Sequence, residues 1–151
     1  ARTNFIITFG SGIGRVWPMK YLLDTHVILW LAYEESKLSE TAKEILLDVK
    51  NEIYLSAVSF WEIGLKFQSG KLDLKGHNPE IVKAGFVQNF DFQELNLEMD
   101  DALTIYKLGS SIHKDPFDRM LIWQSLRHGL TFITADENIN RYREIGLKVF
   151  W

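Results

Sequence analysis

Hydrophobic residues recur along this chain in two patterns, as short apolar runs and as stripes with helical spacing. The runs predict strands, and the stripes, in which apolar residues return every three or four positions, predict helices between them. The helix that Ser39 can cap shows such a stripe, with Ala42, Leu46 and Val49 on one face. The predicted strands are residues 20–23, 53–55, 94–97, 131–133 and 148–150. The predicted helices are residues 27–32, 39–50, 56–67, 81–90, 100–108, 116–128 and 138–144.

Strands and helices therefore alternate from residue 19 onward. This alternation is typical of right-handed crossovers and of a parallel sheet with helices on both faces. We predict an α/β fold, a three-layer α/β/α domain with a mostly parallel central sheet. Ligands of such sheets bind beyond the carboxyl ends of the strands. The side chains that follow each strand are therefore the first candidates for a functional site.

A glycine-rich stretch at residues 10–14 separates the first residues of the chain from this pattern. We interpret residues 19–151 as the domain and residues 1–18 as an extension foreign to the core fold, in which residues 4–9 could form a strand. If that strand is native, it should pair with a sheet edge or a neighbouring subunit. The spacing of the glycines matches neither a dinucleotide fingerprint nor a phosphate-binding P-loop.

Composition narrows the class of protein. The 151 residues fit one domain with its own core, and a hydrophobic fraction of 46% argues against disorder. Cysteine is absent, which excludes disulfides and thiolate metal sites. No apolar run is long enough for a membrane span, and we expect a cytoplasmic protein. The net charge of -3 argues against simple electrostatic binding of nucleic acid, but cations bound to carboxylates would attract phosphate.

Four acidic residues are placed where such a site is expected. Asp24 directly follows the strand at residues 20–23, and Asp136 follows the strand at residues 131–133 after a short gap. Glu62 lies about one and a half turns into the helix predicted at residues 56–67, and Asp118 lies in the first turn of the helix predicted at residues 116–128. Because parallel strands end at one edge of the sheet, these four carboxylates can converge on one pocket.

A cluster of carboxylates needs a counter-charge, since unpaired carboxylates in one cleft repel each other. Hard divalent cations with oxygen ligands, Mg²⁺ or Mn²⁺, supply it. A bound metal ion can lower the pKa of a water molecule and orient it against a phosphodiester, so hydrolysis needs no nucleophilic side chain. The four acids therefore predict a metal-dependent phosphodiesterase.

Each acid also has a purely structural interpretation. Asp24 could be a turn residue beside the better cap Thr25, and Glu62 could pair with Lys66 for about 0.3–0.5 kcal/mol. Asp136 could cap the helix that follows it. Asp115 could be the cap of the helix opened by Pro116, with Asp118 in its first turn. For any one acid this interpretation is at least as good, and only the joint arrangement favours a site.

Four segments resemble, in order and in spacing, the motifs of VapC-type PIN domains, which are toxins of prokaryotic toxin–antitoxin pairs. Residues 19–26, Met-Lys-Tyr-Leu-Leu-Asp-Thr-His, resemble the opening strand, and residues 56–66 resemble the second acidic motif. Residues 113–122 resemble the third motif, which contains Asp-Pro-Phe-Asp-Arg, and residues 134–136 the fourth. The resemblance runs from residue 19 to residue 151 and excludes residues 1–18.

The resemblance implies a function and a set of roles. It implies cleavage of RNA with Mg²⁺ or Mn²⁺, inhibition by a cognate antitoxin, and a homodimer. It assigns metal ligation or positioning of metal-bound water to four acids. These are Asp24, Glu62, Asp118 and Asp136. Thr25 and Thr134 would be supporting hydroxyls, and Asp115 a supporting cap.

Several neighbouring residues keep two interpretations. Arg119 and Lys66 could bind RNA phosphate or orient a carboxylate. We expect His26 to pack at a helix start and His113 to lie in a loop. The aromatic residues in helical apolar patterns predict core or interface anchors rather than platforms for base stacking. These are Trp30, Trp61 and Trp123.

Other functions fit parts of the pattern. A housekeeping PIN nuclease would process RNA without an antitoxin. A receiver-type signalling domain also gathers acids and Mg²⁺ at a parallel sheet, but it needs adjacent acids after the first strand, where this chain has Thr25 and His26. An aspartyl phosphatase usually shows Asp-x-Asp, and His26 stands at its second acidic position. A catalytically silent interaction module would not need an intact set of four acids.

Overall fold

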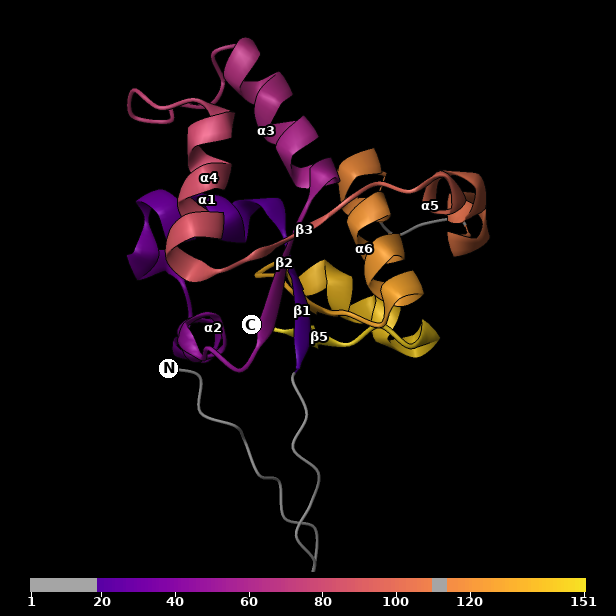
Figure 1. Ribbon diagram of the computed structural model, residues 1–151. Coiled ribbons are helices and arrows are strands. Elements are labelled where there is room, and N and C mark those ends of the chain that lie inside the picture. Colours follow the sequence, from indigo (N-terminus) through magenta and orange to yellow (C-terminus); the bar gives the residue numbers. More distant parts are fainter. Residues whose placement is uncertain (1–18, 110–113) are drawn as a thin grey trace, which may run out of the picture.

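The computed structural model describes residues 19–109 and 114–151. Its centre is one sheet of five parallel strands, with the spatial order β3-β2-β1-β4-β5 (Figure 1). The strands are β1 (Lys20–Leu23), β2 (Glu52–Ser56), β3 (Gln93–Leu95), β4 (Thr131–Ile133) and β5 (Val149–Phe150). The predicted parallel sheet is confirmed. The extension at residues 1–18, the strand predicted within it and the loop position of His113 fall outside the described residues.

Helices follow or precede each strand as the alternation predicts. They are α1 (Thr25–Tyr33), α2 (Glu40–Leu47), α3 (Ala57–Gln68), α4 (Pro79–Phe90), α5 (Met99–Thr104) and α6 (Pro116–His128). Three 3-10 helices complete the set: η1 (Glu35–Lys37), η2 (Ile105–Leu108) and η3 (Glu137–Ile145). The helix predicted at residues 100–108 is thus split into α5 and η2, where the Thr104 hydroxyl donates back to the Asp100 carbonyl. The helix predicted at residues 138–144 is the 3-10 helix η3.

Two hydrophobic cores cover the two faces of the sheet. Along β1, Tyr21 and Leu23 enter one core, and Leu22 between them enters the other, as the period of two in a strand requires. The first core contains side chains of α1, α2 and α4, and the second contains side chains of α6 and η3. In Figure 1 these two groups of helices flank the sheet on opposite sides. The three-layer α/β/α architecture is therefore confirmed.

The strand order reverses between β1 and β4. The chain runs outward from β1 to β2 and β3 and then returns to place β4 and β5 on the other side of β1. Such a reversal opens a crevice at the carboxyl ends of the two central strands, which is where ligands of open α/β sheets bind. Asp24 follows β1 and Asp136 follows β4, separated from it by two residues, so both candidate acids lie at this crevice.

The helices that border the crevice begin at polar caps. Ser56 accepts a hydrogen bond from Val58 N at the start of α3, and Asp115 accepts from Phe117 N and Asp118 N at the start of α6. The caps predicted at Ser56, Asp115 and Asp136 are confirmed. The expectation that Thr25 caps α1 is wrong. Asp24 is the N-cap, because its own carboxylate accepts from Thr25 N while its backbone still extends β1.

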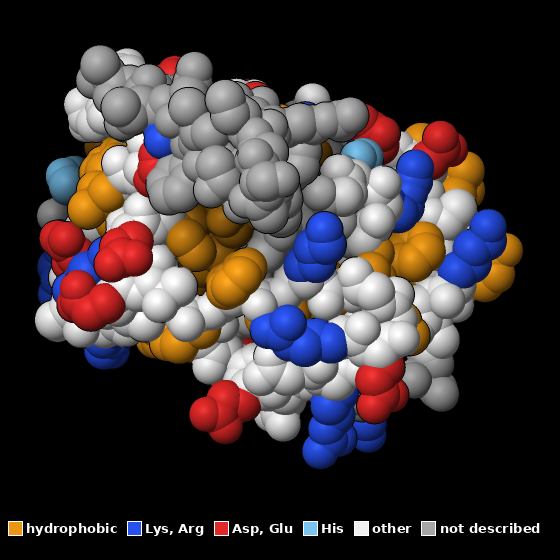
Figure 2. Space-filling model, turned by 90° about the horizontal axis from the view of Figure 1, so that it is seen from below, with side chains coloured by type: hydrophobic (Ala, Val, Ile, Leu, Met, Phe, Trp, Pro, Cys, Tyr) orange, Lys and Arg blue, Asp and Glu red, His pale blue; other side chains and the backbone are white. Residues whose placement is uncertain are grey.

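The opposite end of the molecule, where the strands begin, has a mixed surface. Figure 2 views this end from below, and acidic, basic and apolar side chains are interspersed over its visible part. Among the described helices, none combines the length and apolar character that crossing a membrane requires. The candidate acids lie at the other end of the molecule, where the strands finish.

Candidate active site

Asp24 is the most constrained of the four candidate acids. It is buried at the carboxyl end of β1, with its backbone N–H donating to Ile133 O of β4. Its Oδ1 accepts from Thr25 N at 2.7 Å, and its Oδ2 accepts from the Thr134 hydroxyl at 2.7 Å. Its orientation is therefore fixed from both central strands of the crevice.

The charge of Asp24 is opposed by its surroundings. The pKa of its carboxyl is raised to about 6, mainly by burial and also by the negative charges of Glu62 and Asp136, and this value already includes the lowering effect of the hydrogen bonds from Thr134 and Thr25. Glu62 and Asp136 thus lie close enough to Asp24 for their charges to raise its pKa. The convergence that the sequence predicts is realised for these three acids.

Glu62 is buried on α3 and has one oxygen without a protein partner. Its Oε2 accepts from Lys66 Nζ at 2.7 Å, which confirms the predicted pair one turn apart. Its Oε1 is buried and accepts no hydrogen bond from the described residues. A buried carboxylate oxygen in this condition is costly unless a cation or water completes its shell. The set of carboxylate oxygens therefore fits a divalent cation.

Thr134 connects the two strand ends. Its hydroxyl donates to Asp24 Oδ2 and accepts from Asp136 N at 3.1 Å, while Asp136 caps η3 by accepting from Asn138 N. Thr25, the other predicted supporting hydroxyl, donates at 3.0 Å to the Ser59 hydroxyl of α3. Thr25 therefore supports the position of α3, whereas Thr134 touches the acid itself.

Asp118, on α6, is linked to the other acids by its electrostatic effect on Lys66. The pKa of Lys66 is raised first by its hydrogen bond to Glu62, and also by the charges of Asp115 and Asp118. The ammonium group is therefore bound to the acid of α3 and lies within the electrostatic influence of the two acids at the start of α6. Asp115 is exposed and is engaged as the cap, while Asp118 is half-buried in the first turn.

A buried link between α3 and α6 was missed by sequence reasoning. The Ser56 hydroxyl, which caps α3, donates at 2.6 Å to Gln124 Oε1 of α6, and Gln124 Nε2 donates to Asn96 O. Gln124 is fully buried. A glutamine within the apolar stripe of α6 was the signal that could have found it, because a buried amide must be hydrogen-bonded.

His26 also has a larger part than predicted. Its ring packs against Trp30, as expected for a helix start, with ring centroids 4.8 Å apart. It also lies 3.4 Å from Asp24 Oδ2 and accepts a hydrogen bond from Ala135 N. Burial lowers its pKa, although Asp136 and Glu62 oppose this. The ring therefore belongs to the acidic crevice.

The two cations that could bind RNA phosphate have different surroundings. Lys66 is half-exposed and bound to Glu62. Arg119 donates from Nη2 to Gly109 O at 3.0 Å, which ties α6 to the segment after η2.

Trp61, expected to be a core or interface anchor, is 57% exposed on α3, with its ring in a T-shaped contact with Phe117. It therefore lies on the surface rather than in the core.

A second group of metal-type ligands lies elsewhere. Within the described ranges, the only three such side chains whose ligand atoms all lie within 4.8 Å of one another are Glu98, Asp101 and His128. The four candidate acids are not drawn together as closely. His128 ends α6, ten residues and about 15 Å along the helix from Asp118, so this group is separate from the crevice.

Asp101 in this second group already has partners. It is fully buried, accepts from Glu98 N, and forms ion pairs with Arg127 at 3.3 Å and His128 at 3.0 Å. Its carboxylate thus fastens α5 to the last turn of α6. We interpret it as a structural acid, whereas Glu62 retains an unpartnered oxygen.

Comparison with known proteins identifies the family of this chain. A family model of the PIN domain matches residues 21–145, a range that contains all four candidate acids. This chain belongs to the PIN-domain family. The match contradicts the receiver-type alternative and confirms the family that the four segments resemble.

Individual PIN-domain relatives are distant in sequence and similar in length. Ribonuclease VapC22 of Mycobacterium tuberculosis is 25% identical over 132 residues, which cover 86% of this chain and 97% of that protein. The structure of VapBC2 from Rickettsia felis bound to a DNA fragment from their promoter has a TM-score of 0.62 at 13% identity, covering 87% of this chain and 98% of that one. A toxin–antitoxin complex from Klebsiella pneumoniae has a TM-score of 0.55 at 16% identity, covering 87% and 96%.

The structural role of Asp101 predicts a stability effect without a metal effect. Asp101→Ala should lower the free energy of unfolding by about 3 kcal/mol, because Arg127 and His128 lose their buried counter-charge. Asp100→Ala, at the exposed neighbour in the same turn, should change it by less than about 0.5 kcal/mol. Denaturant unfolding of both variants, with Mn²⁺ titrations, checks this. A loss of Mn²⁺ binding by folded Asp101→Ala would make Asp101 a metal ligand.

The raised pKa of Asp24 predicts how metal stabilisation depends on pH. Folding raises this pKa from 3.8 to about 6, so the ionised carboxylate destabilises the metal-free fold above pH 6, and the penalty vanishes as the pH falls toward 4. A divalent cation needs the ionised form. The rise in melting temperature caused by Mn²⁺ should therefore be largest above about pH 7 and shrink below pH 6. Thermal melts with Mn²⁺ or chelator measure it.

A matched variant identifies the titrating group. Asp24→Asn keeps the shape of the side chain but cannot ionise, so its melting temperature should respond little to Mn²⁺ at any pH. A wild-type response that stays constant down to about pH 5 would contradict the assignment of the pKa to this buried carboxyl.

Proposed function

We propose that this PIN domain is a divalent-metal-dependent ribonuclease and the toxin of a toxin–antitoxin pair. The observation that carries the proposal is the buried Glu62 Oε1, which faces no hydrogen-bond donor among the described residues in a crevice shared with Asp24 and Asp136. The name of the relative VapC22 supports ribonuclease activity. The shared fold with a toxin–antitoxin complex supports the toxin role.

Four carboxylates would hold the cation: Asp24, Glu62, Asp118 and Asp136. All are hard oxygen ligands, which suit Mg²⁺ or Mn²⁺. When bound, such a cation would neutralise the clustered charge, activate water and polarise a phosphodiester. The protein's own contribution is to orient the carboxylates and to offset part of the cost that burial imposes on their ionised form. Thr134 and the backbone of Thr25 do this for Asp24.

Lys66 would have one role before substrate binds and another after it. It neutralises Glu62 and lies within the field of Asp115 and Asp118. It is half-exposed, so it can turn from the carboxylate toward an RNA phosphate when a cation takes over the charge of Glu62. Arg119 is the second candidate for phosphate contact, although its guanidinium is partly used by the Gly109 carbonyl.

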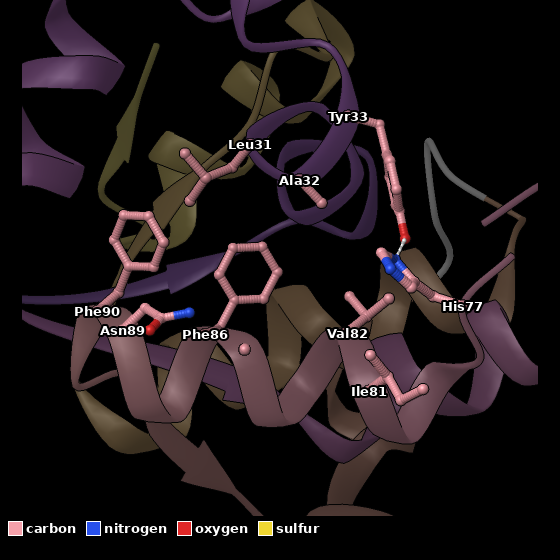
Figure 3. A pocket seen from close by; sticks show the side chains of 10 residues that line it. Leu31, Ala32, Tyr33, His77, Ile81, Val82, Phe86, Asn89 and Phe90 are labelled. Carbon is pink, nitrogen blue, oxygen red and sulfur yellow. Dashed lines mark hydrogen bonds between the residues drawn. The ribbon is translucent and has the colours of Figure 1, made fainter. Parts of the chain in front are cut away.

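An antitoxin would need an apolar surface on which to dock. A groove of about 320 Å³ lies between the last turn of α1 and α4. Figure 3 shows Leu31, Val82, Phe86 and Phe90 around it, with Tyr33 bonded to His77 at one end. An amphipathic segment of the antitoxin fits such a groove and could direct an Arg or Lys toward the acidic crevice.

We also propose a homodimer, whose interface would be formed by exposed apolar side chains outside this groove. Helices α3 and α5 and the helix η2 carry large apolar groups that are about half exposed or more. These are Trp61, Leu65, Met99, Leu103 and Tyr106. An apolar surface of this kind is typical of an interface between subunits.

Asp118 and Asp115 separate the chemical role from the structural one. Asp118→Asn should abolish Mg²⁺-dependent cleavage of total cellular RNA while changing stability little, because it keeps shape and removes charge. Asp115→Ala should lower the free energy of unfolding by about 0.5–2 kcal/mol through the lost cap and leave cleavage largely intact. Cleavage assays and thermal melts under the same metal conditions compare them.

Two outcomes would contradict the mechanism. Undiminished cleavage by purified protein in excess chelator would exclude metal dependence. An inactive but stable Asp115→Ala beside an active Asp118→Asn would reverse the assignment at α6.

The groove predicts which variants lose an antitoxin. A Cβ at Gly85 would meet no atom within 4 Å, so Gly85→Phe should fill the groove without disturbing α4, and Gly85→Ala is the matched control. With the adjacent reading frame co-expressed, wild type and Gly85→Ala should co-purify with its product, and Gly85→Phe should not. Wild type expressed alone should arrest growth. A chain that is tolerated alone yet cleaves RNA in vitro would instead be a housekeeping PIN nuclease.

A further inference from the structure

We propose that His26 is a positioning residue for the proposed metal site, a ring protonated at Nδ1 that ties the residues after β1 to those after β4. The inference rests on the proposed function for its consequence and on the contacts of the ring for its geometry. His26 lies in the first turn of α1, two residues after Asp24. Its two nitrogens face the two sides of the crevice.

The first contact fixes the tautomer. Ala135 N donates a hydrogen bond to His26 Nε2 at 3.1 Å. A backbone N–H can only donate, so Nε2 must offer its lone pair and carry no proton. In a neutral imidazole the proton is then on Nδ1. The ring is thus an acceptor toward the segment after β4.

The second contact uses that proton. Nδ1 lies 3.4 Å from Asp24 Oδ2, the same oxygen that accepts from the Thr134 hydroxyl. The separation is long for a hydrogen bond, but the N–H dipole still favours the ionised carboxylate. Oδ2 therefore accepts a hydrogen bond from Thr134 and lies near the ring nitrogen Nδ1, while Oδ1 accepts from Thr25 N. The ring and Thr134 together set which way the carboxylate turns.

The ring is itself held in place. Trp30 lies against it at 4.8 Å between centroids, and Trp151 lies edge-on at 6.4 Å. These aromatic contacts come from α1 and from the residue after β5, so the ring is fixed independently of its hydrogen bonds. Ala135 directly precedes Asp136. Through this neighbour, His26 restrains the backbone that carries the second acid of the crevice.

Loss of the two nitrogens should therefore weaken metal binding. His26→Phe keeps an aromatic ring against Trp30 but removes both polar contacts, and we expect Mn²⁺ affinity to fall about 10- to 100-fold, as for other residues that orient metal ligands. His26→Gln keeps one donor and one acceptor and should recover part of the affinity. Trp30→Phe, which changes the packing but not the polar contacts, is the matched control and should bind Mn²⁺ nearly as wild type does.

The experiment combines calorimetric Mn²⁺ titrations of these variants with nitrogen NMR of the wild-type histidines, without RNA. The proposal expects an unprotonated Nε2 and a protonated Nδ1 in His26 at neutral pH, with or without Mn²⁺. Wild-type affinity in folded His26→Phe, or a proton found on Nε2, would overturn it. If wild type binds no Mn²⁺, the proposed function fails, while the NMR measurement still decides the tautomer and hence the tie between the two strands. If His26→Phe does not fold, His26→Gln and the NMR result decide.

Discussion

The burial of the Asp24 carboxylate between like charges is the interaction on which the site depends. Removing a carboxylate from water is costly, and Glu62 and Asp136 add repulsion. Two short hydrogen bonds, from Thr25 N and the Thr134 hydroxyl, offset part of that cost. What remains unfavourable is relieved only by a proton or a cation. The fold therefore keeps this carboxyl in a state in which binding a cation is favourable, at some expense to its own stability.

The sheet makes that burial possible. The chain continues from β1 to β2 on one side and from β4 to β5 on the other. In open α/β sheets such a reversal leaves a crevice beyond the carboxyl ends of the two central strands. Asp24 and Asp136 follow their strands, and Glu62 and Asp118 lie in the first two turns of the adjoining helices, which brings all four acids toward this space. Ser56 and Gln124 then fix α3 against α6, so that the helices bearing Glu62 and Asp118 cannot drift independently. A hydrogen bond remote from the acids thus helps set their separation.

Much of this could be predicted from the sequence, for physical reasons. Short runs of three or four residues between helical stripes suffice to predict a parallel sheet, and an acid after a strand suffices for a candidate ligand. The cap of α1 was assigned wrongly because Thr25 is a good cap in isolation, whereas Asp24 serves β1 and α1 at once. The hydrogen bonds of His26 and Gln124 were not predicted, because their partners, Ala135 and Ser56, are far away in the chain. Local patterns cannot indicate contacts that only the packed sheet creates.

The two ends of α6 show that acidic residues can serve a structural role at one end and a chemical role at the other. At its last turn, Asp101 meets Arg127 and His128, and each charge has a partner within about 3.5 Å. Near its first turn, the charges of Asp115 and Asp118 act on the ammonium group of Lys66, which is already ion-paired with Glu62 of α3. Compactness of ligand atoms alone therefore points to the last turn of α6, whereas the proposed metal site lies near its first turn. Excess negative charge, which needs a cation from outside the chain, distinguishes a site that can bind metal from one that fastens two helices.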